Sequence, residues 1–374
     1  MTGRIAEQNE TEKERKSKTA QEDAFRAQLA KIKRAFASKP FTPHSLFRNG
    51  HAQTLAAYAW PRRKRLLRAH HADQARMFEI AKNVQLLAHC HWQTAPTKHP
   101  TLLLAHGLEG SSASPYMLGT GEKAFRAGFN VVRLNLRNCG GTEHLTPTLY
   151  NSGLSTDVYA VLTELIERDA LSHIFLAGFS LSGNIVLKLA GELGANAPRA
   201  LVGICAVSPS VDLHACADAI ERRANWIYQK NFMRSLRRRI RRKRELFPEL
   251  YNLKNLREVR TIRDFDERFT ARDGGYKDAK DYYTRASSLS LLRYIHVPTL
   301  LIHAQDDPFI PFTPLNQALI ADDNPYLLLL APRHGGHVGF IATRASREED
   351  DEDHFWAENR VVEFCRLLDE SFKP

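Results

Sequence analysis

One serine in this 374-residue chain lies where the local sequence could make it a nucleophile. Ser180 stands between an apolar segment, 173–179, and an apolar-faced helical pattern, in the sequence Gly-Phe-Ser-Leu-Ser-Gly. This context predicts a nucleophile elbow, a tight strand-to-helix turn that exposes a serine hydroxyl. The motif differs from G-x-S-x-G because Ser182 occupies its last position, and Ser182 remains a second candidate nucleophile. The alternative is an ordinary Gly-Ser turn that caps a core helix.

A serine hydroxyl needs a base, and the base needs a carboxylate to orient it. A predicted strand, 299–304, is followed at once by Asp306 and Asp307. Asp307 is the preferred acid because of its spacing to Pro311. Asp306 and then Asp212 are the alternatives, and an Asp-Asp-Pro sequence is also a common turn.

The candidate base is His337, which follows the last predicted strand in a glycine-rich loop. Glycines on both sides suit a loop that lets an imidazole reach over the edge of a sheet. A histidine in such a loop is often only polar surface, and His334 is expected to be of that kind. The position of His337 one strand after a suitable acid favours the catalytic interpretation.

Two backbone N–H groups must also point at the oxyanion that forms during acyl transfer. One is expected from Leu181, the residue after the candidate nucleophile. The other is expected from Leu108, which follows His106-Gly107 in the loop after an early apolar strand. A glycine there permits the close backbone approach that this role requires.

The elements that must position these residues are short apolar strands alternating with amphipathic helices. This pattern predicts an α/β fold with a mostly parallel central sheet and helices on both faces. Segment 212–292 supplies no convincing strand and is predicted to be a helical lid insertion over the carboxyl edge of the sheet. The predicted strands are 84–92, 101–105, 130–134, 173–177, 201–207, 299–304 and 326–331.

Composition places the chain among ordinary soluble proteins, with 43% hydrophobic and 25% charged residues. Residues 1–38 are expected to form a charged, flexible tail, and residues 39–374 the folded domain. Within the tail, helical spacing from Phe25 to Phe36 predicts a short helix, docked on the domain or lying on a membrane surface. Five scattered cysteines without a CxxC pair, and no secretory signal, predict a cytoplasmic protein without a metal site.

The formal net charge of +11 is concentrated in one stretch. Residues 222–244 contain 11 Lys and Arg and no Asp or Glu, so the rest of the chain sums to zero. Such a stretch could contact an anionic membrane surface or the acidic run 348–353. It lacks the interleaved aromatic and glycine residues of RNA-binding modules, so no nucleic acid is expected.

Taken together, the motifs resemble those of the α/β-hydrolases, and more narrowly the YheT-like branch, over about residues 40–370. The shared motifs are His106-GLEGS, Gly178-FSLSGN, Asp306-DP and Gly335-GHVGF, with Asn49-GHAQT and Arg137-NCGGTE beside them. The resemblance implies hydrolysis of carboxylic esters, namely short- to medium-chain acyl esters, acylglycerols or phospholipids, and membrane anchoring in animal relatives.

Three hypotheses follow. The leading one is a serine esterase or lipase with Ser180 as nucleophile, His337 as base and Asp307 orienting it, which needs no cofactor. The second is a binder of anionic surfaces or nucleic acid that uses residues 222–244. The third is a catalytically silent α/β-hydrolase-fold protein, since a fold alone does not give a function.

Overall fold

The computed structural model describes residues 27, 29–36, 39–60, 73–322, 324–344, 351 and 353–371. Residues 1–26 of the predicted tail, and the acidic residues 348–350 and 352, lie outside this part of the chain. No helix in the described part combines the length and apolar character needed to cross a membrane.

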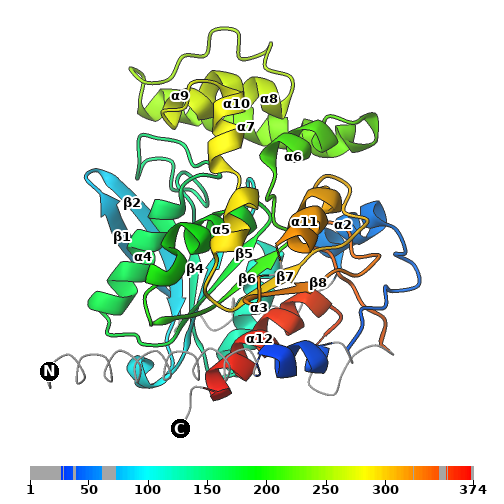
Figure 1. Cartoon of the computed structure of the whole chain (residues 1–374). Coiled ribbons are helices and arrows are strands. Elements are labelled where there is room, and N and C mark those ends of the chain that lie inside the picture. Colours follow the sequence, from blue (N-terminus) through cyan, green and yellow to red (C-terminus); the bar gives the residue numbers. More distant parts are fainter. Residues whose placement is uncertain are drawn as a thin grey trace, which may run out of the picture.

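An eight-stranded sheet forms the centre of the molecule, with the order β1-β2-β4-β3-β5-β6-β7-β8 (Figure 1). Strands β3 to β8 pair in parallel, whereas β1 pairs with β2, and β2 with β4, in antiparallel register. The predicted α/β fold with a mostly parallel sheet is therefore confirmed. The strands are Gln74–Ala81, Val84–His91, Thr101–Ala105, Asn130–Leu134, Ile174–Phe179, Leu201–Val207, Thr299–Ile302 and Leu327–Leu330, from β1 to β8.

Strand β1 is the strand that the sequence pattern missed. It lies at the edge of the sheet, and its burial alternates weakly, with only Phe78 fully buried. The strands at the centre of the sheet, such as β3 and β5, are buried at every position. A fully buried strand appears in the sequence as a continuous apolar run, whereas an edge strand with one wet face does not.

Helices cover both faces of the sheet, as the apolar strands require (Figure 1). Helices α4 (Ser155–Glu167) and α5 (Leu181–Leu193) pack on one face through side chains such as Val161 and Ile185. Helices α3 (Pro115–Arg126) and α12 (Trp356–Ser371) pack on the other through side chains such as Phe364. Alternate residues of β3 serve the two cores, since Leu103 belongs to the first and Leu104 to the second.

The helical character predicted for segment 212–292 is also observed. This segment, called the insertion below, separates β6 from β7 and lies above the carboxyl edge of the sheet in Figure 1. It has its own apolar cluster, which includes Met233, Leu236 and Phe265. Its α-helices are α6 (Leu213–Ile220), α7 (Trp226–Leu246), α8 (Ile262–Phe265), α9 (Ala271–Asp273) and α10 (Ala279–Ala286), with a π-helical turn at Asp266–Thr270.

The remaining helices frame the sheet. Helix α2 (Gly50–Ala59) precedes β1, and α11 (Phe312–Ala321) connects β7 to β8. Three apolar residues before α2 are buried in the core on the α3–α12 face, namely Leu29, Ile32 and Phe36. The ring centroids of Phe36 and Phe364 are 6.5 Å apart. This burial favours the docked helix over the membrane-surface alternative. The 3-10 turns are Pro96–Lys98, Gly194–Asn196, Arg223–Asn225 and Leu289–Tyr294.

Candidate active site

The turn between β5 and α5 holds Ser180 in a rare backbone conformation. Its φ is 55° and its ψ is −115°, a region that L residues seldom occupy. The turn is so tight that a Cβ on Gly178 would lie 2.1 Å from the carbonyl oxygen of Ser182. These are the features predicted for a nucleophile elbow, and they point the Ser180 side chain out of the end of the strand.

Ser182 has a different environment from Ser180. Its side chain is completely buried, and its hydroxyl donates a hydrogen bond to the carbonyl oxygen of His106. The serine in this position of the motif therefore ties the elbow to the neighbouring loop after β3. In the described part of the chain, the Ser182 hydroxyl has no hydrogen bond to a base, whereas that of Ser180 lies 2.9 Å from His337 Nε2.

The structure brings Ser180, His337 and Asp307 together, although they are far apart in sequence. Nδ1 of His337 lies 2.8 Å from Asp307 Oδ2, and its Nε2 lies 2.9 Å from Ser180 Oγ. A carboxylate can only accept, so Nδ1 carries the proton and Nε2 is free to accept from the serine hydroxyl. The Phe309 ring, 4.1 Å from the imidazole between centroids, covers one side of the histidine.

The side chain of Asp307 is fully buried, and both of its oxygens take part in hydrogen bonds. Its second oxygen, Oδ1, accepts from the backbone N–H groups of Phe309 and Ile310, at 3.1 and 2.9 Å. Burial acts to raise the pKa of Asp307, but His337, His303 and the Ile310 N–H together hold it below its ordinary value. The carboxyl is therefore charged beside the imidazole.

The two alternative acids do not reach His337. Asp306 accepts a hydrogen bond from the Gly336 N–H at 2.9 Å and lies 3.1 Å from Nδ1 of His334, so it supports the loop that carries the base. Asp212 caps the start of α6 by accepting from the Ala215 N–H. His334 is more exposed than His337, with 44% against 10% of its side chain accessible.

Helix α2 also supports the loop of His337, a role that the sequence analysis did not assign to the Asn49-GHAQT motif. The hydroxyl of Thr54 accepts from the His337 N–H at 2.8 Å and donates to the Gly50 carbonyl oxygen at 2.7 Å. The buried Gln53 amide bonds both the N–H and the carbonyl of Ile341. The motif thus fixes both ends of a loop almost 300 residues away, and no local pattern could reveal that contact.

The loop after β3 passes close to Ser180. A Cβ on Gly107 would lie 3.0 Å from Ser180 Cβ, closer than ordinary van der Waals contact, so glycine favours this approach. Leu108 and Leu181 both border the cavity at Ser180. Within the described residues, neither of their backbone N–H groups has a hydrogen-bond acceptor. Both donors are therefore available to a ligand at this point.

His106 is a further positioning residue of this loop. Its Nε2 accepts from the Leu136 N–H at 3.1 Å, and its Nδ1 donates to the Gly107 carbonyl oxygen at 2.8 Å. Complete burial lowers the pKa of His106 to about 4, so the ring is neutral near pH 7. A neutral imidazole is what these two bonds require, since Nε2 must keep its lone pair.

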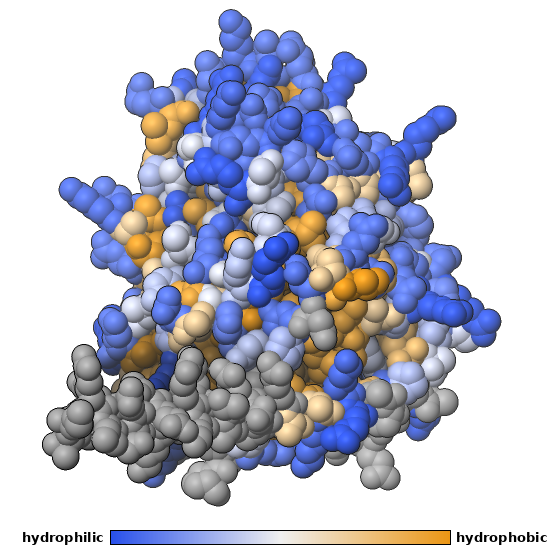
Figure 2. Space-filling model, in the orientation of Figure 1, coloured by the Kyte–Doolittle hydropathy of each residue, from blue (hydrophilic) through white to orange (hydrophobic). Residues whose placement is uncertain are grey.

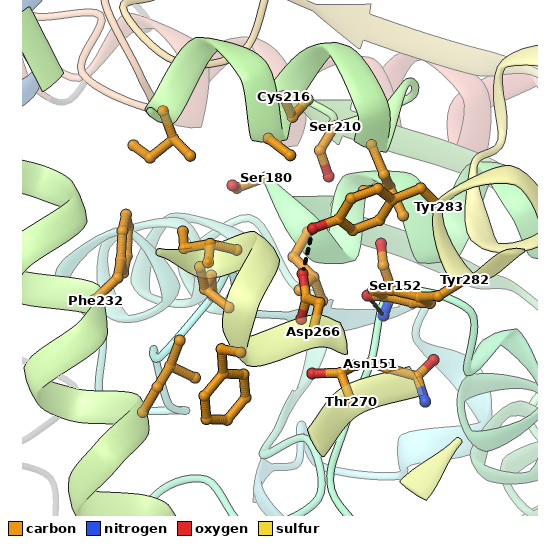
Figure 3. Close-up of a pocket in the computed structure, with 18 of the residues that line it drawn as sticks. Asn151, Ser152, Ser180, Ser210, Cys216, Phe232, Asp266, Thr270, Tyr282 and Tyr283 are labelled. Atoms are coloured by element: carbon orange, nitrogen blue, oxygen red, sulfur yellow. Dashed lines mark hydrogen bonds between the residues drawn. The ribbon is translucent and has the colours of Figure 1, made fainter. Parts of the chain in front are cut away.

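Two cavities meet at Ser180. The first, about 120 Å³, lies under the insertion and is lined mainly by apolar side chains, among them Leu213, Phe232 and Phe265 (Figure 3). The second, about 350 Å³, is bordered by His337, by α2 and by the start of α7. Within the described residues, no group of three His, Cys, Asp or Glu side chains is arranged to hold a metal ion.

Asp266 is the unexpected polar residue of the first cavity. It lies in the π-helical turn of the insertion, and its Oδ2 accepts from the Tyr283 hydroxyl at 2.8 Å (Figure 3). Burial raises the pKa of Asp266 to about 6, although Thr270, Tyr283 and Arg263 oppose the shift. This carboxyl therefore changes charge near neutral pH in the wall of the cavity.

Comparison with known proteins gives consistent relatives. A family described as the alpha/beta hydrolase fold matches residues 100–342. The chain is 33% identical to YheT of Escherichia coli, named as an esterase, over 73% of this chain and 79% of that protein. It is 31% identical to mouse phospholipase ABHD3, over 65% of this chain but 58% of that protein.

Solved structures show the same fold at low identity. The Pyrococcus furiosus esterase Pf2001 superposes with a TM-score of 0.54 over 88% of this chain and 98% of that one, at 15% identity.

The raised pKa of Asp266 predicts pH-dependent stability. In the unfolded chain an Asp titrates near pH ~3.9, so between about pH 4 and 6 the folded protein keeps a proton that the unfolded chain has lost. The free energy of unfolding therefore falls as pH rises through this window. Asp266→Asn should stabilise the protein by about 3 kcal/mol at pH 8 and by about half as much at pH 5. Urea unfolding at both pH values checks this, and an equal gain at both would contradict it.

Proposed function

The chain belongs to the α/β-hydrolase family, and on that basis we propose that it hydrolyses carboxylic esters through an acyl-enzyme formed on Ser180. The observation that carries the proposal is the chain of hydrogen bonds from Asp307 through His337 to Ser180. Relatives named as an esterase and a phospholipase support this reaction class. The intact hydrogen-bond chain argues against a catalytically silent protein.

In the first half of the reaction, Ser180 Oγ attacks the ester carbonyl carbon while Nε2 of His337 takes the hydroxyl proton. Asp307, held charged and oriented by two backbone N–H groups, stabilises the imidazolium that forms. The N–H groups of Leu108 and Leu181 bind the oxyanion. As the tetrahedral intermediate collapses, the C–O bond to the alcohol breaks, and the alcohol takes the proton from Nε2.

In the second half, water repeats the attack on the acyl-enzyme. His337 takes a proton from the water, and its return to Ser180 Oγ releases the carboxylic acid. Both halves use the same groups, and neither requires a cofactor.

The two cavities supply the two sides of the ester. The alcohol must leave next to the residue that protonates it, and His337 borders the second cavity but not the first. The acyl chain then occupies the first cavity, which carries mostly apolar walls. An engineered apolar cavity of about 150 Å³ takes up benzene, so 120 Å³ suits a short acyl chain. Among the short- to medium-chain esters and acylglycerols expected from the sequence, those with a short acyl chain fit this cavity best.

A second proposal concerns anionic membrane surfaces. Eight of the 11 cations in 222–244 are exposed, and Arg234, Arg238 and Arg241 lie on one outward face of α7 by helical spacing. Figure 2 shows a mainly hydrophilic surface over the insertion. Trp226 and Ile227, both more than half exposed, begin the same helix. Such a face suits loose contact with anionic lipids.

The nucleophile can be tested directly. Ser180→Ala should abolish covalent labelling by a fluorophosphonate and lower turnover of a small soluble ester by several orders of magnitude, roughly 10⁴-fold or more. Ser182→Ala is the matched control, because it removes only the buried bond to His106 and should still label. Labelling that survives in Ser180→Ala and disappears in Ser182→Ala would assign the nucleophile to Ser182.

The acid can be tested by paired substitutions at adjacent positions. Asp307→Asn should fold but lose about 10⁴-fold in kcat, because the amide favours the wrong imidazole tautomer. Asp306→Asn should cost much less, since it touches the loop and not His337 itself. Steady-state kinetics on the two purified variants decide between them, and a larger loss in Asp306→Asn would reverse the assignment.

The surface contact predicts salt-sensitive binding to vesicles that contain phosphatidylglycerol. Arg234, Arg238 and Arg241 changed together to Gln should abolish co-sedimentation at low salt, whereas soluble-ester turnover should persist. Screening over about 8 Å at physiological ionic strength should weaken binding of the unmodified protein as salt rises. Lys82, Lys98 and Arg168, exposed and distant, changed to Gln give a control with the same loss of charge. Equal binding by both triple variants, or salt-independent binding, would exclude this contact.

A further inference from the structure

A buried ion pair connects the basic helix of the insertion to the loop after β3. The guanidinium of Arg239, on α7, bonds one carboxylate oxygen of Glu109 through Nη2 at 2.8 Å and through Nε at 3.0 Å. Only 8% of the Arg239 side chain and 7% of the Glu109 side chain are accessible. Glu109 is the residue directly after Leu108, the proposed oxyanion donor.

The carboxylate of Glu109 is surrounded by further donors. The Tyr150 hydroxyl donates to its Oε1 at 2.8 Å, and the Ser235 hydroxyl, also on α7, donates to its Oε2. The Glu109 N–H in turn donates to the Tyr150 oxygen at 3.0 Å. Each oxygen of this carboxylate is thus fixed in direction, and α7 supplies two of the residues that fix it.

Arg239 is equally constrained. Besides Glu109, its guanidinium donates to the carbonyl oxygen of Asn138 and lies 5.1 Å from the centre of the Tyr150 ring. Asn138 belongs to the loop after β4, so one side chain joins the insertion to two loops at the carboxyl edge of the sheet. Neither charge can leave this arrangement without becoming a buried, unpaired ion.

The backbone at Glu109 explains why such a clamp matters for its neighbour. Glu109 has a φ of 55°, a backbone angle that is unfavourable for residues other than Gly, Asn or Asp. The peptide that joins Leu108 to Glu109 carries the Leu108 carbonyl and the Glu109 N–H. The conformation of Glu109 sets the direction of that peptide and so fixes the chain on the C-terminal side of the Leu108 N–H. A strained conformation persists only when surrounding contacts determine it, and the Glu109 side chain makes those contacts.

We propose that Glu109 and Arg239 are positioning residues that hold the Leu108 N–H in the direction needed to bind the oxyanion. The inference rests on the proposed ester hydrolysis. In this proposal, α7 is a structural part of the active site. Arg239 and Ser235 of α7 both contact the Glu109 carboxylate, so α7 takes part in setting the geometry of the loop after β3.

The test uses the full chain and three variants: Glu109→Gln, Arg239→Met and the double substitution. Turnover of a small soluble ester is expressed per active site, counted by fluorophosphonate titration, so misfolded protein does not contribute. Each single variant should lose roughly 10- to 100-fold in kcat, the size expected for a displaced catalytic group, with little change in the KM of Glu109→Gln. A trifluoromethyl ketone reacts with the serine to form a tetrahedral oxyanion that resembles the transition state. The affinity of the enzyme for this inhibitor should therefore fall by the same factor as kcat/KM.

The double variant separates positioning from charge balance. It removes both buried charges, so its thermal midpoint should recover most of what either single variant loses, whereas its kcat should stay low. Arg242→Met is the matched control, because Arg242 lies on the same helix, is exposed and, among the residues that the structure describes, pairs only with Glu245. Its kcat should be unchanged.

Two results would overturn the inference: unchanged kcat per titrated site in both single variants, or a double variant that recovers kcat together with its thermal midpoint. A wild-type protein that neither labels nor turns over ester would overturn the proposed function, and this inference with it. An active wild type with unaffected variants overturns this inference alone.

Discussion

The tight turn at Ser180 is the constraint on which the rest of the site depends. A backbone at φ 55° and ψ −115° is costly for a serine, so packing around the turn must hold it. The turn has space because Gly178 has no side chain. Gly183 likewise allows Pro209 to approach, since a Cβ on Gly183 would lie 2.9 Å from the Pro209 Cα. The Gly107 loop closes on the turn from another side. The glycines therefore mark where backbones converge on one hydroxyl.

The order of strands then determines which residues can reach that hydroxyl. Strand β5 lies near the middle of the sheet, with β3 on one side and β6 and β7 on the other. Parallel strands present their carboxyl ends on one edge, so the loops after β3, β7 and β8 all open toward Ser180. Asp307 and His337 come from two of these loops, and Leu108 comes from the third. Residues separated by more than 150 positions thus meet at hydrogen-bond distance.

The sequence was sufficient where function depends on local context, and insufficient where it depends on contacts across the fold. Ser180, Asp307 and His337 each follow an apolar strand, so their positions at one sheet edge were predictable. The support that Thr54 gives to His337, and the ion pair of Glu109 with Arg239, join segments 283 and 130 residues apart. Glu109 lies within a motif, but its partner Arg239 lies in the basic stretch 222–244, for which the sequence predicted contact with an anionic membrane surface or with the acidic run 348–353. Edge strand β1 was not predicted for another reason, because its apolar and polar residues do not alternate regularly enough to indicate a strand.

The basic helix α7 shows how one stretch of charge can serve two purposes. Its apolar residues Met233, Leu236 and Ile240 follow helical spacing and face inward. Arg239 and Lys243 share that face, so the fold must provide acceptors for them. Lys243 donates to the carbonyls of Glu143 and Thr146, and burial lowers its pKa to about 8. Two cations of this stretch are therefore buried and structural, Arg237 is half-buried and donates to the Val259 carbonyl, and the other eight are exposed. Net charge alone could not distinguish these groups, whereas the 3.6-residue period of the helix does.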